Sequence, residues 1–384
     1  MRAAVIAAIL TIVAFIAGYA IWNRVSDNQA KLRREKFQRD FFNGVLPPIA
    51  EPYLAAGKAK ELNFKVVELG GDTVHNLSED GHILMLSRMG SLDHPSDYEL
   101  LGPDQKPLKA FKNADRVYMT PKGDCYAFRT DSPNGIATSI EMPDGTVRPI
   151  NSENQMRFNY KHGSIKALGT EAFLFIDENI SKQYRPFEYY DLSLTKRTAT
   201  IHEAITYIKQ ATSSELGDIC VGFEQSLGGH NSYNLGIFKN GEVKAENIPI
   251  PHEYFRVKAS KDKIAVTAGS DFFERIPFLR VAKSQYERIG VPKGAIVAEI
   301  SAMNSNGEYL MDYGVPNHTR PARVQQIDNY SCLVSNGKFY LLRDIIKQFF
   351  PGSKEKLDFS IQLLDERGDL VVMGSVKSYL LLRQ

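Results

Sequence analysis

The sequence is organised by one recurring phrase, in which a short strand leads into a tight turn and then into a mainly apolar strand. The seven turn positions are Gly81, Gly123, Gly169, Gly217, Lys263, Gly307 and Gly368. They lie 42 to 48 residues apart, except for a last interval of 61 that contains an inserted stretch over 341–356. A unit of about 45 residues has the length of four short strands with their turns. The spacing therefore predicts seven repeated sheets over residues 63–384.

The second strand of the repeated phrase is apolar at consecutive positions. The clearest cases are 83–86, 172–176, 264–266 and 370–373. A strand with one face in water alternates polar and apolar residues, so these strands indicate sheets that are buried on both faces. Radial stacking gives every sheet a neighbour on each side. We therefore expect an all-β, seven-bladed β-propeller.

The two ends of the repeat region predict how the ring closes. The last unit ends at residues 378–383, its third strand, whereas residues 64–69 form a strand-like segment before the first unit. Folded β proteins avoid exposed strand edges. Residues 64–69 are therefore expected to pair with 378–383 as the fourth strand of the last sheet.

The turn phrases resemble those of known bacterial repeat proteins. The closing portion, with Asn336-Gly337, Gly368 and 379–382, is similar to HAF-type repeats, and the turns 78–81 and 120–123 are similar to those of TolB-type propellers. Lys263 departs from this pattern, because it stands at a turn position that other units fill with glycine. The resemblance implies a propeller fold, an exported or envelope setting and no defined catalytic activity.

The N-terminal segment predicts attachment to a membrane. Residues 3–22 carry no charge, and 20 residues span a hydrocarbon layer of about 30 Å as a helix. We interpret 1–23 as a transmembrane signal-anchor helix and 24–62 as a basic stalk and linker; a cleaved signal peptide is the alternative. The basic residues after the helix favour a cytoplasmic propeller, whereas the family resemblance favours an extracytoplasmic one. The sequence therefore leaves both sides of the membrane open for the propeller.

Composition and motifs restrict the chemistry. The net charge of +2 over 384 residues gives no reason to expect a nucleic-acid partner. Cys125, Cys220 and Cys332 lie within apolar strands without metal-ligand spacing, and we interpret them as small buried side chains. The sequence contains no metalloprotease, nucleophile-elbow or phosphate-loop motif, so we predict no cofactor, no metal and no catalytic residue.

Two sets of residues are candidates for binding. Loops after the second strands are expected on one face of the ring, and rigid scaffolds display function on loops; a shared metal site is excluded there because the units are spread round the ring. The ligand-face candidates are His94, Asp97, His230, Asp271, His318 and Arg320. The inserted stretch has helical spacing, with partner-docking candidates Ile345, Phe349 and Phe350. Solvated loops, and packing of the helix over the rim, are the respective alternatives.

These observations favour a membrane-anchored β-propeller that serves as a protein-interaction or scaffold module for an unidentified protein partner, without a defined catalytic activity. The alternative is a small-ligand-binding protein, or a hydrolase- or lyase-type enzyme, whose site lies at the mouth of the central channel. Convergent carboxylates with perturbed pKa values in the channel would favour this alternative.

Overall fold

The computed structural model describes most of the chain from residue 31 onward. The described residues are 18–19, 22, 24–25, 28–29, 31–69, 73–88, 95–130, 137–151, 163–168, 172–177, 188–191, 195–198, 200–201, 207–213, 219–227, 230–239, 242–246, 248, 254–260, 263–269, 274–320, 325–351, 362–373 and 378–384. Within them the strands form seven sheets, and each sheet contains four consecutive antiparallel strands or, in the last case, three. The turn positions Gly169 and Gly217 lie outside the described residues.

The first four sheets follow chain order. The first sheet contains β3 (Thr73–Leu77), β4 (Ile83–Arg88), β5 (Ser96–Leu101) and β6 (Pro107–Ala114), and the second contains β7 (Arg116–Met119), β8 (Cys125–Arg129), β9 (Ser139–Glu141) and β10 (Val147–Pro149). The third sheet contains β11 (Gly163–Leu168), β12 (Ala172–Asp177), β13 (Glu188–Asp191) and β14 (Lys196–Thr198). The fourth sheet contains β16 (Tyr207–Ser213), β17 (Ile219–Leu227), β18 (His230–Lys239) and β19 (Glu242–Glu246), and β15 (Thr200–Ile201) pairs in parallel with β19.

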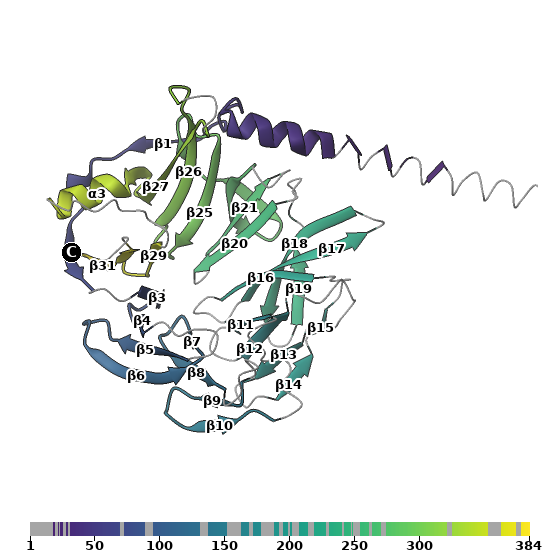
Figure 1. The fold of residues 1–384 in the computed structure, drawn as a ribbon. Helices are drawn as coiled ribbons and strands as arrows, with labels where there is room; N and C mark the ends of the chain where they lie inside the picture. The colour runs from purple at the N-terminus through teal and green to yellow at the C-terminus, as the bar shows by residue number, and fades with distance from the viewer. Residues whose placement is uncertain are drawn as a thin grey trace, which may run out of the picture.

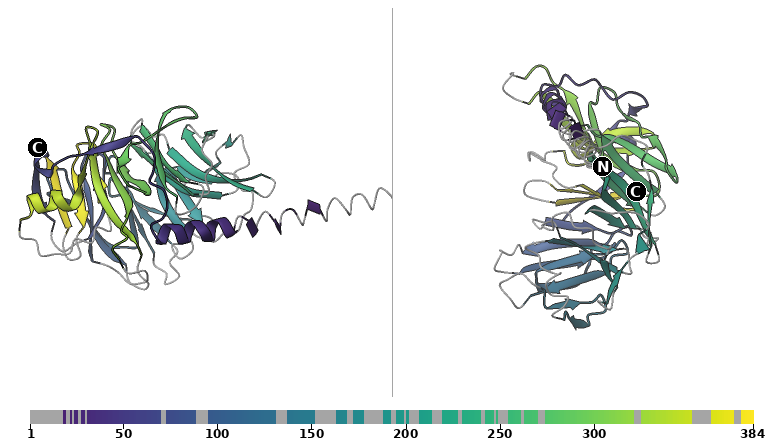
Figure 2. Two further views of the ribbon diagram at one scale, coloured as in Figure 1. Left: turned by 90° about the horizontal axis from the view of Figure 1, so that it is seen from above. Right: turned by 90° about the vertical axis from the view of Figure 1, so that its right-hand side faces the viewer.

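The remaining sheets complete a circle. The fifth sheet contains β20 (Tyr254–Ser260), β21 (Lys263–Gly269), β22 (Ile276–Ala282) and β23 (Gln285–Arg288). The sixth sheet contains β25 (Val297–Met303), β26 (Tyr309–Pro316), β27 (Ile327–Ser335) and β28 (Lys338–Leu341), and it is extended by β1 (Tyr53–Ala56) and β24 (Val291–Pro292). The seventh sheet contains β29 (Gln362–Leu364), β30 (Leu370–Met373), β31 (Ser378–Arg383) and β2 (Phe64–Glu68). Each sheet contacts the next, and β29 contacts both β25 and β3, so the contacts run through all the sheets and return to the first. Figures 1 and 2 show the sheets arranged around a common axis. The fold is an all-β propeller.

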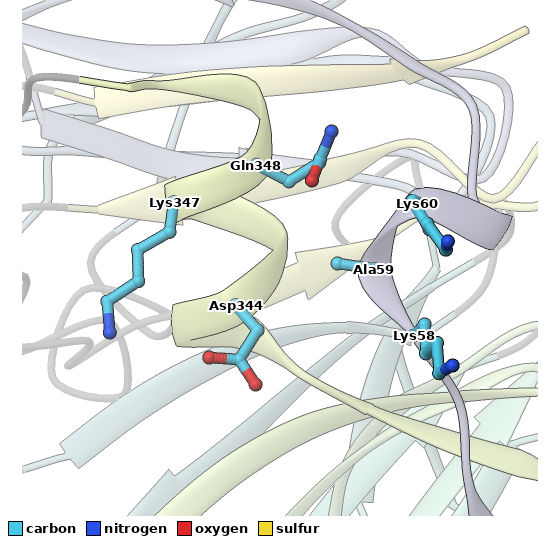
Figure 3. A pocket seen from close by; sticks show the side chains of 6 residues that line it. All are labelled: Lys58, Ala59, Lys60, Asp344, Lys347 and Gln348. Carbon is cyan, nitrogen blue, oxygen red and sulfur yellow. The ribbon is translucent and has the colours of Figure 1, made fainter.

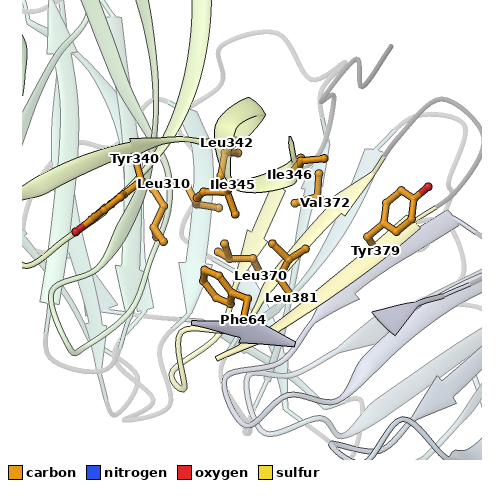
Figure 4. Close-up of a cluster of buried hydrophobic side chains, with 11 residues drawn as sticks. Phe64, Leu310, Tyr340, Leu342, Ile345, Ile346, Leu370, Val372, Tyr379 and Leu381 are labelled. Atoms are coloured by element: carbon orange, nitrogen blue, oxygen red, sulfur yellow. The ribbon is translucent and has the colours of Figure 1, made fainter. Parts of the chain in front are cut away.

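The seventh sheet joins the two ends of the repeat region. β2 pairs antiparallel with β31, with Phe64 opposite Arg383 and Glu68 opposite Tyr379, so these are the two segments that the sequence pairs. Phe64 packs with Leu370 and Leu381 in a buried cluster that also receives Leu310 from the sixth sheet (Figure 4). Burying a side chain of this size contributes about 1.5–3 kcal/mol. The strand is therefore held by its side chains as well as by its backbone.

Helix α3 (Leu342–Phe349) covers the same cluster. Ile345 is fully buried, and Phe349 and Phe350 pack against the cluster; the Phe349 ring lies edge-on to that of Phe64, with their centroids 5.8 Å apart. The described part of the inserted stretch is helical over Leu342–Phe349, as predicted. The docking candidates Ile345, Phe349 and Phe350 face this core, however, because the helix lies over the junction of the sixth and seventh sheets and buries its apolar side there. The alternative, packing over the rim, describes the structure.

The segment before β2 is attached to the sixth sheet. β1 pairs in parallel with both β28 and β24, and the buried Ile49 donates its backbone N–H to the Ala295 carbonyl. The short helix η1 (Ala59–Glu61) then leads into β2. Residues 49–61, which the sequence assigns to a linker, thus cross the outside of the ring in a defined path.

A helix over residues 31–42 precedes this path, and its end also contacts the sixth sheet. The Gln326 N–H donates to the Phe42 carbonyl at 3.0 Å. The predicted transmembrane residues 1–23 lie largely outside the described residues. No helix in the described part of the chain has the length and apolarity that crossing a membrane requires.

The recurring turns have a common geometry that explains their glycines. Gly81, Gly123, Gly307 and Gly368 all have φ between +82° and +90°, which L side chains rarely adopt. Each of the four also has a side chain of the preceding sheet within 3.4 Å of where a Cβ would lie. A Cβ on Gly123, for example, would lie 2.6 Å from His82 Nδ1. The glycine therefore permits both the turn and the close contact between neighbouring sheets.

We expect Gly123→Ala to destabilise the fold more than Gly145→Ala. Both glycines have almost the same φ, +84° and +85°, but a Cβ on Gly145 would meet nothing within 4 Å. The conformational cost of about 1–2 kcal/mol applies to both variants, and overpacking against His82 adds about 1–3 kcal/mol to Gly123→Ala alone. Chemical denaturation measures the difference. Equal loss of stability in the two variants would show that the contact with His82 contributes nothing.

Candidate functional site

The turns at one end of the sheets are joined to one another by hydrogen bonds. The Ser305 N–H donates to the Glu366 carboxylate at 2.9 Å, the Glu366 N–H donates to the Glu79 carbonyl at 3.0 Å, and the Glu79 N–H donates to the Pro121 carbonyl at 2.8 Å. Ser260 of the fifth sheet also donates its hydroxyl to Glu366. The turns of the sixth, seventh, first and second sheets are therefore linked in order, and the fifth is connected through Glu366.

Asp365 is the most perturbed carboxyl in this network. Burial, followed by the negative charge of Asp369, raises its pKa from 3.8 to about 6. Such shifts often mark functional sites, but the geometry here explains the residue structurally. Its Oδ1 accepts the N–H groups of Arg367 and Asp369 at 2.9 and 2.8 Å. Ser78, Thr120 and Asn304 accept the equivalent N–H in their own turns. Asp365 is therefore a turn cap.

Asp365→Asn should remove a pH dependence of stability. The folded-state pKa lies above the unfolded value, so the wild-type residue favours folding at low pH, and this contribution is lost as the pH rises from about 4 to about 6. The loss amounts to roughly 1–3 kcal/mol. Asparagine already serves as the cap in the sixth sheet, at Asn304. We therefore expect the unfolding free energy of Asp365→Asn, relative to that of the wild type, to increase as the pH rises from 4 to 6. Chemical denaturation between pH 4 and 7 measures this difference.

Asp144→Asn is the matched control for this pH series. Thr146 donates its hydroxyl and its N–H to the exposed Asp144 carboxylate, and these bonds lower the pKa of Asp144. Its stabilising contribution is present above about pH 4 and is lost in acid, which is the opposite sign. A stability difference between wild type and Asp365→Asn that stays constant from pH 4 to 7 would contradict the assignment.

A second polar cluster lies on the inner strands of the fifth and sixth sheets. Glu299 on β25 is 6% exposed. It accepts a hydrogen bond from Arg256 on β20 and another from Arg275 Nη1, the latter at 3.0 Å. Lys258 follows Arg256 by two residues and therefore shares its face of β20. The two guanidinium groups compensate the buried carboxylate and join neighbouring sheets.

Asp312 adds a second carboxyl to this cluster. It is paired directly with Glu299 across β25 and β26 and accepts a hydrogen bond from the Ser331 hydroxyl. The side chain reaches solvent, but the surrounding protein, ahead of the negative charge of Glu299, raises the pKa of the Asp312 carboxyl. We call Arg256, Lys258, Arg275, Glu299 and Asp312 the inner cluster. It combines a solvent-accessible carboxyl with two partly exposed guanidinium groups, and it is our candidate functional site.

A surface cleft between α3 and η1 is a weaker candidate. It has a volume of about 340 Å³ and is lined by Lys58, Ala59, Lys60, Asp344, Lys347 and Gln348. Figure 3 shows that the amines of Lys58 and Lys60 lie on the opposite side of the cleft from that of Lys347 and do not point to a common centre. Such lysines are typical of a solvated surface, and we assign the cleft no ligand.

The structure does not bring the predicted ligand-face residues together. His94 and Asp271 lie outside the described residues, and for His230 only the backbone position, at the start of β18, is described. Asp97 on β5 accepts the Asn113 N–H at 2.9 Å and pairs with Arg88 at 3.0 Å. His318 is exposed in a turn of the sixth sheet, where Arg320 pairs with Asp328. Asp97 and Arg320 thus form ion pairs within their own sheets.

The inner cluster was not among the sequence predictions, although part of its signal is visible. Glu299 is a single carboxylate within the apolar strand 297–303, and Arg256 and Lys258 alternate with apolar residues in 254–260. A charge within a buried strand requires a partner. What the sequence does not indicate is that the partner comes from the neighbouring sheet.

Metal and thiol chemistry have few candidates in the described part of the chain. No group of three or more His, Cys, Asp or Glu side chains there has the geometry to hold a metal ion. Cys125 and Cys332 are free and buried, as the sequence predicts. Burial raises the pKa of Cys125 to about 12 and also raises that of Cys332, so both thiols are neutral at physiological pH.

Comparisons with known proteins return distant similarity of fold. No family model matches the sequence, and no curated protein matches it either. Similar solved structures include virginiamycin B lyase from Staphylococcus aureus (11% identity, 84% of this chain and 100% of that chain, TM-score 0.48) and the β-propeller domain of the Trilobed protease from Pyrococcus furiosus (8%, 82% and 94%, TM-score 0.47). TolB from Acinetobacter baumannii is a third (11%, 79% and 80%, TM-score 0.36).

Proposed function

We propose that this chain is a seven-bladed β-propeller, attached to a membrane through residues 1–23, that serves as a protein-interaction module. The observation that carries the proposal is the inner cluster, in which accessible guanidinium groups are held in place by a buried carboxylate. The proposal includes a relationship to HAF-type repeat proteins. It also includes an extracytoplasmic position of the propeller, which that resemblance implies.

The path of the N-terminal segment supports attachment of the ring in a fixed orientation. The helix over 31–42, the buried Ile49 and the parallel strand β1 all connect to the sixth sheet. A membrane segment before residue 24 would therefore hold the propeller on a short docked arm instead of a loose tether. An orientation fixed in this way suits a module that presents one site to a partner.

The electrostatics of the inner cluster support recognition of an acidic group. Arg256 and Arg275 have 45% and 30% of their side chains exposed, while Glu299 between them has 7%. Each guanidinium has five donors, and Glu299 accepts one hydrogen bond from each. These ion pairs orient both guanidinium groups, and the planar guanidinium group is the side chain that best matches a carboxylate. A partner side chain or chain end that carries a carboxylate fits this site.

Replacing both arginines, Arg256→Gln with Arg275→Gln, should strongly reduce partner capture. We expect proteins that crosslink to the full-length chain in membranes to be reduced at least about tenfold, the range of an interface hot spot. The control is Arg320→Gln, which removes a comparably exposed arginine from an ion pair elsewhere on the sixth sheet and should leave capture unchanged. Quantitative mass spectrometry after crosslinking compares the three proteins, with thermal unfolding to confirm folding. Recovery of the same proteins in equal amounts from all three would overturn the proposal.

Asp312 favours a second candidate function, a small-ligand-binding or hydrolase- or lyase-type propeller with its site at the mouth of the central channel. Burial, ahead of the negative charge of Glu299, raises the pKa of the Asp312 carboxyl, and raised pKa values are a feature of carboxyls that serve as general acids in enzymes. Under this alternative, Asp312→Asn would abolish turnover of a small substrate while crosslinked capture of proteins stayed unchanged. Under the interaction proposal, the same substitution leaves the arginine pair and its hydrogen bonds to Glu299 in place.

A further inference from the structure

Exposed apolar side chains are concentrated in the N-terminal segment. In the part of the chain that the structure describes, ten large apolar side chains are exposed, and seven of them precede the first repeat. The seven are Tyr19, Trp22, Val25, Leu32, Phe42, Val45 and Tyr53. Single apolar residues are normal on a protein surface, but their concentration on one segment marks a contact site. The repeats contribute only the other three.

One side of the N-terminal helix is turned toward the ring. We call the described residues 24, 25, 28, 29 and 31–42, which are all helical, the stalk helix (Figure 1). Phe37, Asp40 and Phe41 are partly buried and recur at the spacing of one helix side. The Gln326 N–H, which donates to the Phe42 carbonyl, connects this end of the helix to the sixth sheet. The side with Phe37 and Phe41 therefore faces the protein.

A second side of the stalk helix is exposed and combines apolar with basic residues. Val25 and Leu32 are 50% and 64% exposed, and Lys36 and Arg39 are exposed as well. Their positions place these four side chains in one stripe, about 130° around the helix from Phe37. The helix therefore presents this stripe to its surroundings and not to the ring.

The basic excess of the whole protein lies in the same segment. Residues 24–42 contain six lysines and arginines and three acidic residues, a net charge of +3, whereas the complete chain has a net charge of +2. Glu35 pairs with Lys31 at 4.0 Å, so one of the three acids is compensated within the helix. An exposed apolar stripe accompanied by lysines and arginines is typical of a helix that lies in a membrane interface.

We propose that the stalk helix lies along the surface of an anionic phospholipid bilayer. Val25 and Leu32 enter the boundary between head groups and acyl chains, and Lys36 and Arg39 extend to the phosphates. The stripe also has the spacing of a coiled-coil seam, but a second copy would bring Lys36 and Arg39 against like charges. Its charges thus favour lipid over a second copy. This inference rests on the membrane attachment in the proposed function and adds a lipid class to it.

Quenching of tryptophan fluorescence by phospholipids brominated in the upper acyl chain tests the contact. The full-length protein is reconstituted in vesicles of equal parts phosphatidylcholine and phosphatidylglycerol. Trp22 is the only tryptophan in the sequence, so Trp22→Phe allows a single reporter elsewhere. Trp22→Phe with Leu32→Trp should be quenched, whereas the matched control, Trp22→Phe with Phe37→Trp, should not. A helix standing upright from residue 23 would hold position 32 roughly 14 Å above the hydrocarbon, beyond this quencher.

Removing the charges should weaken the contact. Each basic residue near an anionic surface contributes about a fivefold preference. Adding Lys36→Gln and Arg39→Gln to the Leu32→Trp protein, or omitting phosphatidylglycerol, should therefore reduce the quenching at position 32. Lys122→Gln with Lys283→Gln is the matched control, because it removes two exposed lysines of the propeller, and it should leave the quenching unchanged.

The wild-type Trp22 reports separately on the proposed membrane attachment. Quenching of Trp22 without quenching of Leu32→Trp would overturn the surface contact and leave the attachment standing. Equal quenching of Leu32→Trp and Phe37→Trp, or quenching of Leu32→Trp that is the same without phosphatidylglycerol, would also overturn it. No quenching at either position would contradict both proposals. Leu32 is exposed, so its replacement leaves the core intact, and thermal unfolding shows that each variant is folded.

Discussion

The fold depends on sheets whose two faces are both apolar. Neighbouring residues of one strand enter different cores: Leu84 packs in the cluster between the first and second sheets, whereas Ile83 packs in the cluster between the seventh and first. Val371 and Val372 of β30 divide in the same way. A stack of such sheets that ended anywhere would expose one apolar face to water. Only a closed circle buries every face, and the β2–β31 pairing joins the chain ends within it.

Closure also determines what the turns must do. The turns between the first and second strands contact those of neighbouring sheets, and their backbone polar groups need partners. The chain meets this need with a polar cap at the first turn position and with bonds from turn to turn through Glu366 and Glu79. Glycine at the fourth position leaves room for the side chain of the preceding sheet, and Lys263 occupies that position in the fifth sheet and reaches to 3.4 Å from where a Cβ on Gly307 would lie.

The sequence was sufficient for features that depend on periodicity. The spacing of the turns, the apolar second strands and the unpaired segment near Val66 together predict a propeller and the pairing of its ends, and the spacing of Ile345 and Phe349 predicts a helix. Other features depend on pairing between distant segments. β1 has only four residues, mostly exposed, so it carries no periodic signal, and its place beside β28 follows from the tertiary fold. The Arg256–Glu299 ion pair likewise follows from the tertiary fold, because it joins neighbouring sheets. The loop residues that the sequence predicts for a ligand face are instead dispersed among several sheets.

A pair of cysteines across the closing strands tests the central claim most directly. Lys65 is exposed and lies opposite Leu382 in the β2–β31 ladder, at the separation of about 5 Å that a disulfide needs. The account predicts that Lys65→Cys with Leu382→Cys forms an intramolecular disulfide on mild oxidation, visible as faster migration on a non-reducing gel, and that the bond raises the unfolding midpoint. If the folded protein instead keeps both thiols free, or links only between molecules, the two ends do not close the ring.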